Sequence, residues 1–243
     1  MEVRLGTGRG RHVMLDMRAT LFLILPLFAL IFGFGSLYVE GMTLGYGDLP
    51  IGPVEKFLLG TFSGLIFLLS FILHELAHCV MAQHFEHDVK GITLHVFGGA
   101  SEYEPVGDRS RGEVSIAAAG PLVSLGLGLP LAYLYLTFLT EPGPLVPQIL
   151  AVTVALLAAF NLLLGVFNVL PAYPMDGGMA LMAYLARKRD TERTVIVAAR
   201  AGRILAVIMV VIGVFLPNFI PIAIGVYLYI AAEYSRWHWD MMR

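Results

Sequence analysis

Long apolar runs constrain this chain more than any other feature of its sequence. Six apolar runs cover residues 19–39, 57–83, 114–138, 149–170, 195–216 and 219–232, and all but the short last run are about as long as a membrane span. A helix needs about 20 apolar residues to cross a bilayer, and its backbone groups must all be hydrogen-bonded internally there. Only 14% of the residues are charged, against about 25% in an average soluble domain. The sequence therefore predicts an all-α polytopic membrane protein with about six transmembrane helices.

The number of spans depends on how the first and last runs are interpreted. The first run is longer than the roughly 7 to 15 apolar residues of a cleavable signal sequence, so we expect it to remain as an anchor. The last two runs are separated only by residues 216–218, and an alternative with five spans and a re-entrant last segment stays open. No segment is long and polar enough for a separate soluble domain. We expect one transmembrane domain over residues 1–243, with no appended soluble domain.

The few charges predict an orientation and exclude one class of partner. Arg4, Arg9, Arg11 and Arg18 precede the first run, whereas residues 40–55 contain neither lysine nor arginine. Because such basic flanks are usually cytoplasmic, we expect a cytoplasmic N-terminus. The net charge of -2 argues against a nucleic-acid partner, which would require a basic face. The single cysteine excludes a disulfide within the chain.

An ionisable cluster lies near the end of the second run, in the sequence His74-Glu75-Leu76-Ala77-His78. Side chains four apart on a helix lie on one face, so His74 and His78 can reach one metal ion. Glu75, about 100° round the axis, can contact a water on that ion. Ionisable groups in an apolar helix are costly unless they are compensated, and Zn²⁺ in this HExxH arrangement would compensate them. We expect the nearby His84 and His87 to be interfacial residues rather than ligands.

A catalytic zinc usually has three protein ligands and one open position for water. Asp176 is the best candidate for the third ligand, because Pro171 and Pro174 end the fourth run before it and two glycines after it permit a sharp turn. Irregular backbone at membrane depth is either buried in protein or lines a wet cavity. The alternative is that Asp176 caps the helix that follows.

The two motifs together resemble the site-2 protease family of intramembrane zinc metalloproteases. The second motif, residues 168–178, reads NVLPAYPMDGG, and similar positions include Gly98-Gly99-Ala100 and Ala119-Gly120-Pro121-Leu122. The resemblance implies hydrolysis of peptide bonds within or near transmembrane segments of other proteins. It also implies one zinc ion per chain held by His74, His78 and Asp176, with Glu75 as the catalytic acid/base. By the same resemblance, Asn168 contacts the substrate or the oxyanion.

Two further features bear on how water and substrate reach such a site. Asn161 and Asn168 are seven residues apart and share one face of the fourth helix, where they could line a polar cavity open to the cytoplasm. For Asn161, hydrogen bonding between helices is the alternative. Residues 91–103 alternate imperfectly between apolar and polar side chains, which predicts a short β-like segment between helices two and three. Its free edge could pair with an extended substrate, and an interfacial loop is the alternative.

A zinc or proton transporter is the main rival function, since intramembrane His and Asp also mark ion pathways. A transport pathway predicts polar groups on several spans. The first, third and fifth runs carry almost no ionisable group, apart from Arg200 and Arg203. A catalytically inactive scaffold is a second rival, and the intact Glu75 argues against it. We therefore expect a protease whose partners are transmembrane substrates and the lipid bilayer.

Overall fold

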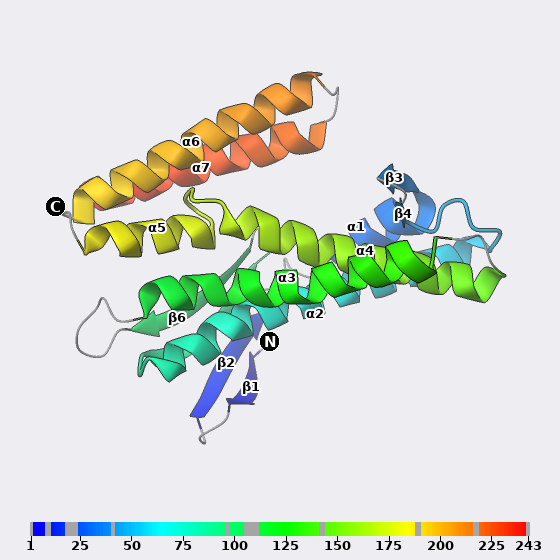
Figure 1. Ribbon diagram of the computed structural model, residues 1–243, viewed down its shortest axis with the longest axis horizontal. Helices are drawn as coiled ribbons and strands as arrows, with labels where there is room; N and C mark the ends of the chain where they lie inside the picture. The colour runs from blue at the N-terminus through cyan, green and yellow to red at the C-terminus, as the bar shows by residue number, and fades with distance from the viewer. Residues whose placement is uncertain are drawn as a thin grey trace. The chain divides into compact units, whose positions relative to one another are not determined.

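The computed structural model describes residues 2–7, 11–17, 24–39, 42–95, 98–104, 112–140, 144–187, 191–215 and 219–241 (Figure 1). Its contacts divide the chain into two compact units. The first unit comprises Met1–Pro105 and Leu122–Gly165, and the second comprises Val106–Pro121 and Val166–Arg243.

Four helices in the described part of the chain are long and apolar enough to cross a membrane. They are α2 (Pro53–His84), α3 (Glu113–Phe138), α4 (Leu145–Val169) and, within α6 (Thr191–Phe215), the segment Arg193–Phe215. The longest, α2, has 32 residues, or about 48 Å at 1.5 Å per residue. In α7 (Phe219–Met241) the apolar stretch is shorter, Pro221–Tyr234. The prediction of a helical membrane protein is confirmed, whereas the count of six spans is not.

The first predicted span is described only from Ile24 onward, and its end differs from the prediction. The helical part of the described residues there consists of α1 (Ile24–Phe28) and a π-helix, η2 (Ala29–Gly33), and is followed by strand β3 (Leu37–Val39), which pairs with β4 (Met42–Leu44). Residues 19–23 lie outside the described residues. After β4 the chain folds back onto the end of this helix, where the backbone N–H of Tyr46 donates to the Phe32 carbonyl at 2.7 Å. Apolar composition alone did not reveal that reversal.

A four-stranded sheet lies in the first unit, with strand order β1-β2-β5-β6. Its strands are β1 (Glu2–Thr7), β2 (Arg11–Met17), β5 (Asp88–His95) and β6 (Gly98–Glu104). The pairs β1–β2 and β5–β6 are antiparallel, and β2 runs parallel to β5. The β-like segment predicted at residues 91–103 is therefore confirmed, as parts of two paired strands. The strands β1 and β2 were not predicted.

The core of the first unit is built around Tyr46, which is fully buried together with Val152, Leu156 and Phe160. The Tyr46 hydroxyl lies 3.1 Å from Ser63 Oγ on α2 and 2.9 Å from Thr153 Oγ1 on α4. Tyr46 thereby joins the chain after β4 to both helices. The contacts fix the N-terminal half of α2, whose C-terminal half carries the HExxH motif.

A close approach of two backbones brings α2 against η2. A Cβ placed on Gly60 would lie 2.7 Å from the Gly33 nitrogen and 2.8 Å from the Ala29 Cα. Those distances are too short for any side chain, so glycine is required at Gly60. The face of α2 that carries Gly60 and Gly64 is buried.

In the second unit, α6 and α7 lie side by side (Figure 1). A Cβ on Gly225 of α7 would lie 2.6 Å from the Ala206 carbonyl oxygen of α6, so the two backbones approach closely. Arg203 and Glu233 form an ion pair across them at 2.9 Å. The short helix α5 (Asp176–Ala186) precedes this pair in the sequence.

Candidate active site

The HExxH motif lies in the last third of α2, a helix whose ends the sequence defines clearly. Pro53 occupies its first turn and Glu55 lies near its N-terminus, where proline geometry and negative charge are both favourable. At its C-terminus, Glu86 adopts a positive φ of 63° and the backbone N–H of His87 donates to the Ala82 carbonyl at 2.9 Å. The motif is therefore held on a continuous, regular helix.

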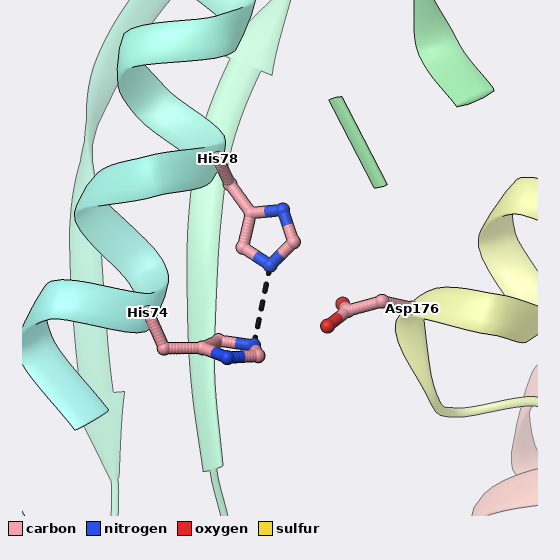
Figure 2. A group of neighbouring side chains, drawn as sticks. All are labelled: His74, His78 and Asp176. Carbon is pink, nitrogen blue, oxygen red and sulfur yellow. Dashed lines mark hydrogen bonds between the residues drawn. The ribbon is translucent and has the colours of Figure 1, made fainter. Parts of the chain in front are cut away.

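His74 and His78 face one another from consecutive turns of α2 (Figure 2). Their exposed fractions are 2% and 6%, and their Nε2 atoms lie 3.3 Å apart. Two nitrogens that bind one tetrahedral zinc ion at about 2.0–2.1 Å lie roughly 3.3–3.4 Å from each other. The spacing of these two donors therefore fits a shared zinc ion.

The second ring nitrogen of His74 has a partner that the sequence reasoning missed. Its Nδ1 lies 2.9 Å from the Oγ of Ser124 on α3, and Ser124 is 1% exposed. This leaves Nε2 as the nitrogen that faces His78. The signal in the sequence was a single hydroxyl in an apolar run, which is too common a feature to indicate a contact 50 residues away.

Glu75 follows His74 on α2 and is also buried, with 7% of its surface exposed. A carboxylate at this depth in an apolar helix is costly unless other groups stabilise it. Its place beside the histidine pair is the one that the HExxH pattern predicts for a general base.

Asp176 is the first residue of α5, and Met175 occupies the N-cap position. The alternative that Asp176 is the helix cap therefore does not match the structure. Its side chain is partly buried, and Figure 2 draws its carboxylate with the two imidazoles. A Cβ on Gly178 would lie 2.5 Å from the carbonyl carbon of Ala172, so this glycine allows α5 to start tightly against the preceding turn.

The two asparagines of α4 have different environments. Asn161 is fully buried, and its Nδ2 donates to Ser70 Oγ at 3.0 Å and to the Leu157 carbonyl at 2.8 Å. The alternative of hydrogen bonding between helices is therefore the one that describes Asn161. Asn168, in the last turn of α4, is partly buried.

The two histidines that follow the motif behave differently from one another. His84, at the end of α2, is exposed as expected for an interfacial residue. His87 is buried, with 2% of its surface exposed, which the sequence did not indicate. The positive φ at Glu86 turns the chain back toward the end of α2, which brings His87 inward.

Known proteins resemble this chain in both sequence and structure. The model of the family named peptidase family M50 matches residues 139–215. The candidate zinc metalloprotease Rip3 of Mycobacterium tuberculosis is 38% identical over 161 residues, which are 66% of this chain and 40% of that protein. A zinc metalloprotease of Methanocaldococcus jannaschii is 35% identical over 171 residues, which are 70% of this chain and 48% of that protein.

The structural comparison covers more of the chain than the sequence comparisons do. The structure of a site-2 protease from Methanocaldococcus jannaschii matches with a TM-score of 0.61 and 27% identity, over 97% of this chain and 95% of that one. The chain spans less than half the length of the two metalloproteases described above. None of these similarities supports a transporter. The family model, the zinc metalloproteases and the site-2 protease structure therefore agree: this chain is similar to the site-2 proteases of peptidase family M50 in both sequence and fold.

Proposed function

We propose that this chain is an intramembrane zinc metalloprotease that hydrolyses peptide bonds within or near transmembrane segments of other membrane proteins. The observation that carries the proposal is the buried pair of imidazoles, whose Nε2 atoms lie 3.3 Å apart. The adjacent buried Glu75 supports hydrolysis over mere metal storage, because a structural zinc site needs no general base. We propose that residues 1–243 act as one metalloprotease domain.

We propose that His74, His78 and Asp176 hold one zinc ion. Each residue offers one ligand atom, and these atoms lie within 4.8 Å of one another. Two imidazole nitrogens and one carboxylate form a donor set that catalytic zinc sites use, with a fourth position left for water. The partial burial of Asp176 is compatible with that role.

The catalytic steps fall to the residues of the chain. When bound, zinc lowers the pKa of a water ligand toward about 7 and polarises the scissile carbonyl. Glu75 accepts a proton from the water as its oxygen attacks the carbonyl carbon, and returns that proton to the leaving amide nitrogen as the C–N bond breaks. Asn168, proposed from the family resemblance, donates a hydrogen bond to the substrate or to the developing oxyanion.

The position of the motif along α2 suggests where substrates are cut. His78 and His74 lie about 9 Å and 15 Å along the helix axis from its last residue, at 1.5 Å per residue. With the N-terminus on the cytoplasmic side, as the basic N-terminal flank suggests, cleavage takes place within the cytoplasmic half of the substrate's span. Strand β6 ends the sheet in the order β1-β2-β5-β6, and we propose that its edge pairs with the unwound substrate.

Zinc content and cleavage, measured together, test the proposal. His74→Ala, His78→Ala and Asp176→Ala should each lower bound zinc and abolish cleavage of a model transmembrane substrate, because each removes one of three ligands. Full zinc content and activity in Asp176→Ala would show that another group is the third ligand. Unchanged zinc content in both histidine variants would overturn the metal site itself.

A further inference from the structure

Ser124 contacts the metal site directly although it belongs to neither motif. It lies on α3, and its Oγ is 2.9 Å from Nδ1 of His74. Both side chains are almost completely buried, with exposed fractions of 1% and 2%. Water therefore does not compete for this contact, and a buried ring nitrogen without a partner would be costly.

The contact bears on which ring nitrogen of His74 carries the proton. A neutral imidazole has one N–H donor and one acceptor nitrogen, and a serine hydroxyl offers two acceptor lone pairs. If Nδ1–H donates to Ser124, the lone pair of Nε2 is directed toward His78, whose Nε2 is 3.3 Å away. The opposite assignment places the proton on Nε2, which then cannot bind a metal ion.

We propose that Ser124 is a positioning residue for the metal site. It accepts a hydrogen bond from Nδ1–H of His74, and so selects the tautomer and fixes the ring orientation in which Nε2 serves as a ligand. The inference rests on the proposed function, because it concerns a ligand of the same zinc site. Loss of a partner that orients a metal-binding histidine typically lowers metal affinity by about 10- to 100-fold.

The main test measures zinc affinity of the purified full chain by competition with a chromophoric chelator. Ser124→Ala should weaken zinc binding by about 10- to 100-fold, whereas Ser124→Thr, which keeps a hydroxyl, should retain most of the affinity. Ser63→Ala is the matched control, because Ser63 is equally buried but hydrogen-bonds Tyr46, about 16 Å along α2 from His74. Its zinc affinity should equal that of the wild type.

Two further measurements separate positioning from general packing. Visible spectra of the cobalt(II) form should change in Ser124→Ala and stay unchanged in Ser63→Ala, because only the first variant alters the orientation of a ligand. In a His74→Ala background, Ser124→Ala should cause no further loss of affinity, since Ser124 acts through that imidazole. If Ser124→Ala does not fold, Ser124→Cys serves instead, because a thiol is a weaker acceptor.

The possible outcomes distinguish this inference from the function on which it rests. If His74→Ala weakens zinc binding while Ser124→Ala does not, the positioning role is wrong and the zinc site stands. If His74→Ala binds zinc as tightly as the wild type, the zinc site itself is wrong. An equal loss from Ser124→Ala in the wild-type and His74→Ala backgrounds would assign Ser124 to packing and overturn the inference.

Discussion

Replacing Tyr46 by phenylalanine should cost little stability, although its hydroxyl has two buried neighbours. The Tyr46 hydroxyl lies 3.1 Å from Ser63 Oγ and 2.9 Å from Thr153 Oγ1. Those two hydroxyls are also placed to donate one turn back, to the Leu59 carbonyl at 3.1 Å and the Ile149 carbonyl at 2.7 Å. The three hydroxyl groups carry three protons for these four contacts, so only three of the contacts can be hydrogen bonds at one time. Without the Tyr46 hydroxyl, Ser63 and Thr153 keep their carbonyl partners. Tyr46→Phe should therefore cost about one hydrogen bond, roughly 0.5–1.5 kcal/mol.

Replacing Tyr46 by alanine should cost considerably more. The ring is fully buried among Val152, Leu156 and Phe160, and its removal leaves a cavity that backbone atoms cannot easily fill. Truncation of a buried aromatic side chain to alanine typically costs about 3–5 kcal/mol. The ring, more than its hydroxyl, should hold the chain after β4 against α2 and α4.

Reversible unfolding in mixed micelles, followed as the mole fraction of sodium dodecyl sulfate rises, measures both values. The free energy of unfolding should fall by about 1 kcal/mol in Tyr46→Phe and by about 3–5 kcal/mol in Tyr46→Ala. Equal losses of unfolding free energy in the two variants would refute the inference that the Tyr46 hydroxyl contributes only about one hydrogen bond. A loss below about 1 kcal/mol in Tyr46→Ala would refute the assignment of this ring to the core.

Three more expectations follow from other parts of the molecule. Gly128→Ala should lower the free energy of unfolding, because its Cβ would lie 2.8 Å from the Leu162 nitrogen. Gly126→Ala should be neutral or stabilising by up to about 1 kcal/mol, because nothing lies within 4 Å of its Cβ. Equal losses of stability in the two variants would contradict this expectation. Tyr38 donates a hydrogen bond to Asp48 at 2.5 Å, and this contact lowers the pKa of Asp48. It therefore stabilises β3 and β4 above about pH 4. The stabilisation is lost as the pH falls through the lowered pKa of Asp48. The protection factors of the β3 amides, which compare each exchange rate with the intrinsic rate at the same pH, should therefore fall on acidification in the wild type and not in Asp48→Asn. An equal fall in both proteins would refute the link. Replacing Gly, Pro or Asn in a substrate's span by Leu should slow cleavage without preventing membrane insertion, because a stable helix hides its carbonyls. Mass spectrometry of the cleavage products would measure the rate. Unchanged cleavage rates would contradict the need for unwinding.

The parts of the fold that could be predicted from the sequence are those set by local periodicity. The apolar runs predicted α2, α3 and α4, because helices are the main way for such runs to satisfy their backbone groups in a bilayer. The spacing of His74 and His78 predicted that both would lie on one face, and the structure places their Nε2 atoms 3.3 Å apart. Both results depend on residues only a few positions apart.

The parts that could not be predicted depend on contacts between distant residues. The run at residues 19–39 is as apolar as a span, yet its last residues form β3. That strand pairs with β4, and the N–H of Tyr46, after β4, donates to the Phe32 carbonyl. Ser124 gave no signal, because a hydroxyl in an apolar helix usually satisfies its own backbone. The pairing of β2 with β5 joins segments about 75 residues apart, and neither strand alternates strongly enough to indicate its partner.

Glu75→Gln tests the central claim most directly, since it removes proton transfer while leaving both imidazoles in place. Zinc content and the rate of cleavage of a reconstituted transmembrane substrate should be measured on the same preparations. The proposal predicts one zinc ion per chain in both proteins and a rate that falls by about 10²- to 10⁴-fold in the variant. Cleavage at the wild-type rate by zinc-loaded Glu75→Gln would contradict Glu75 as the general base, and zinc transport without proteolysis in either protein would contradict the protease itself.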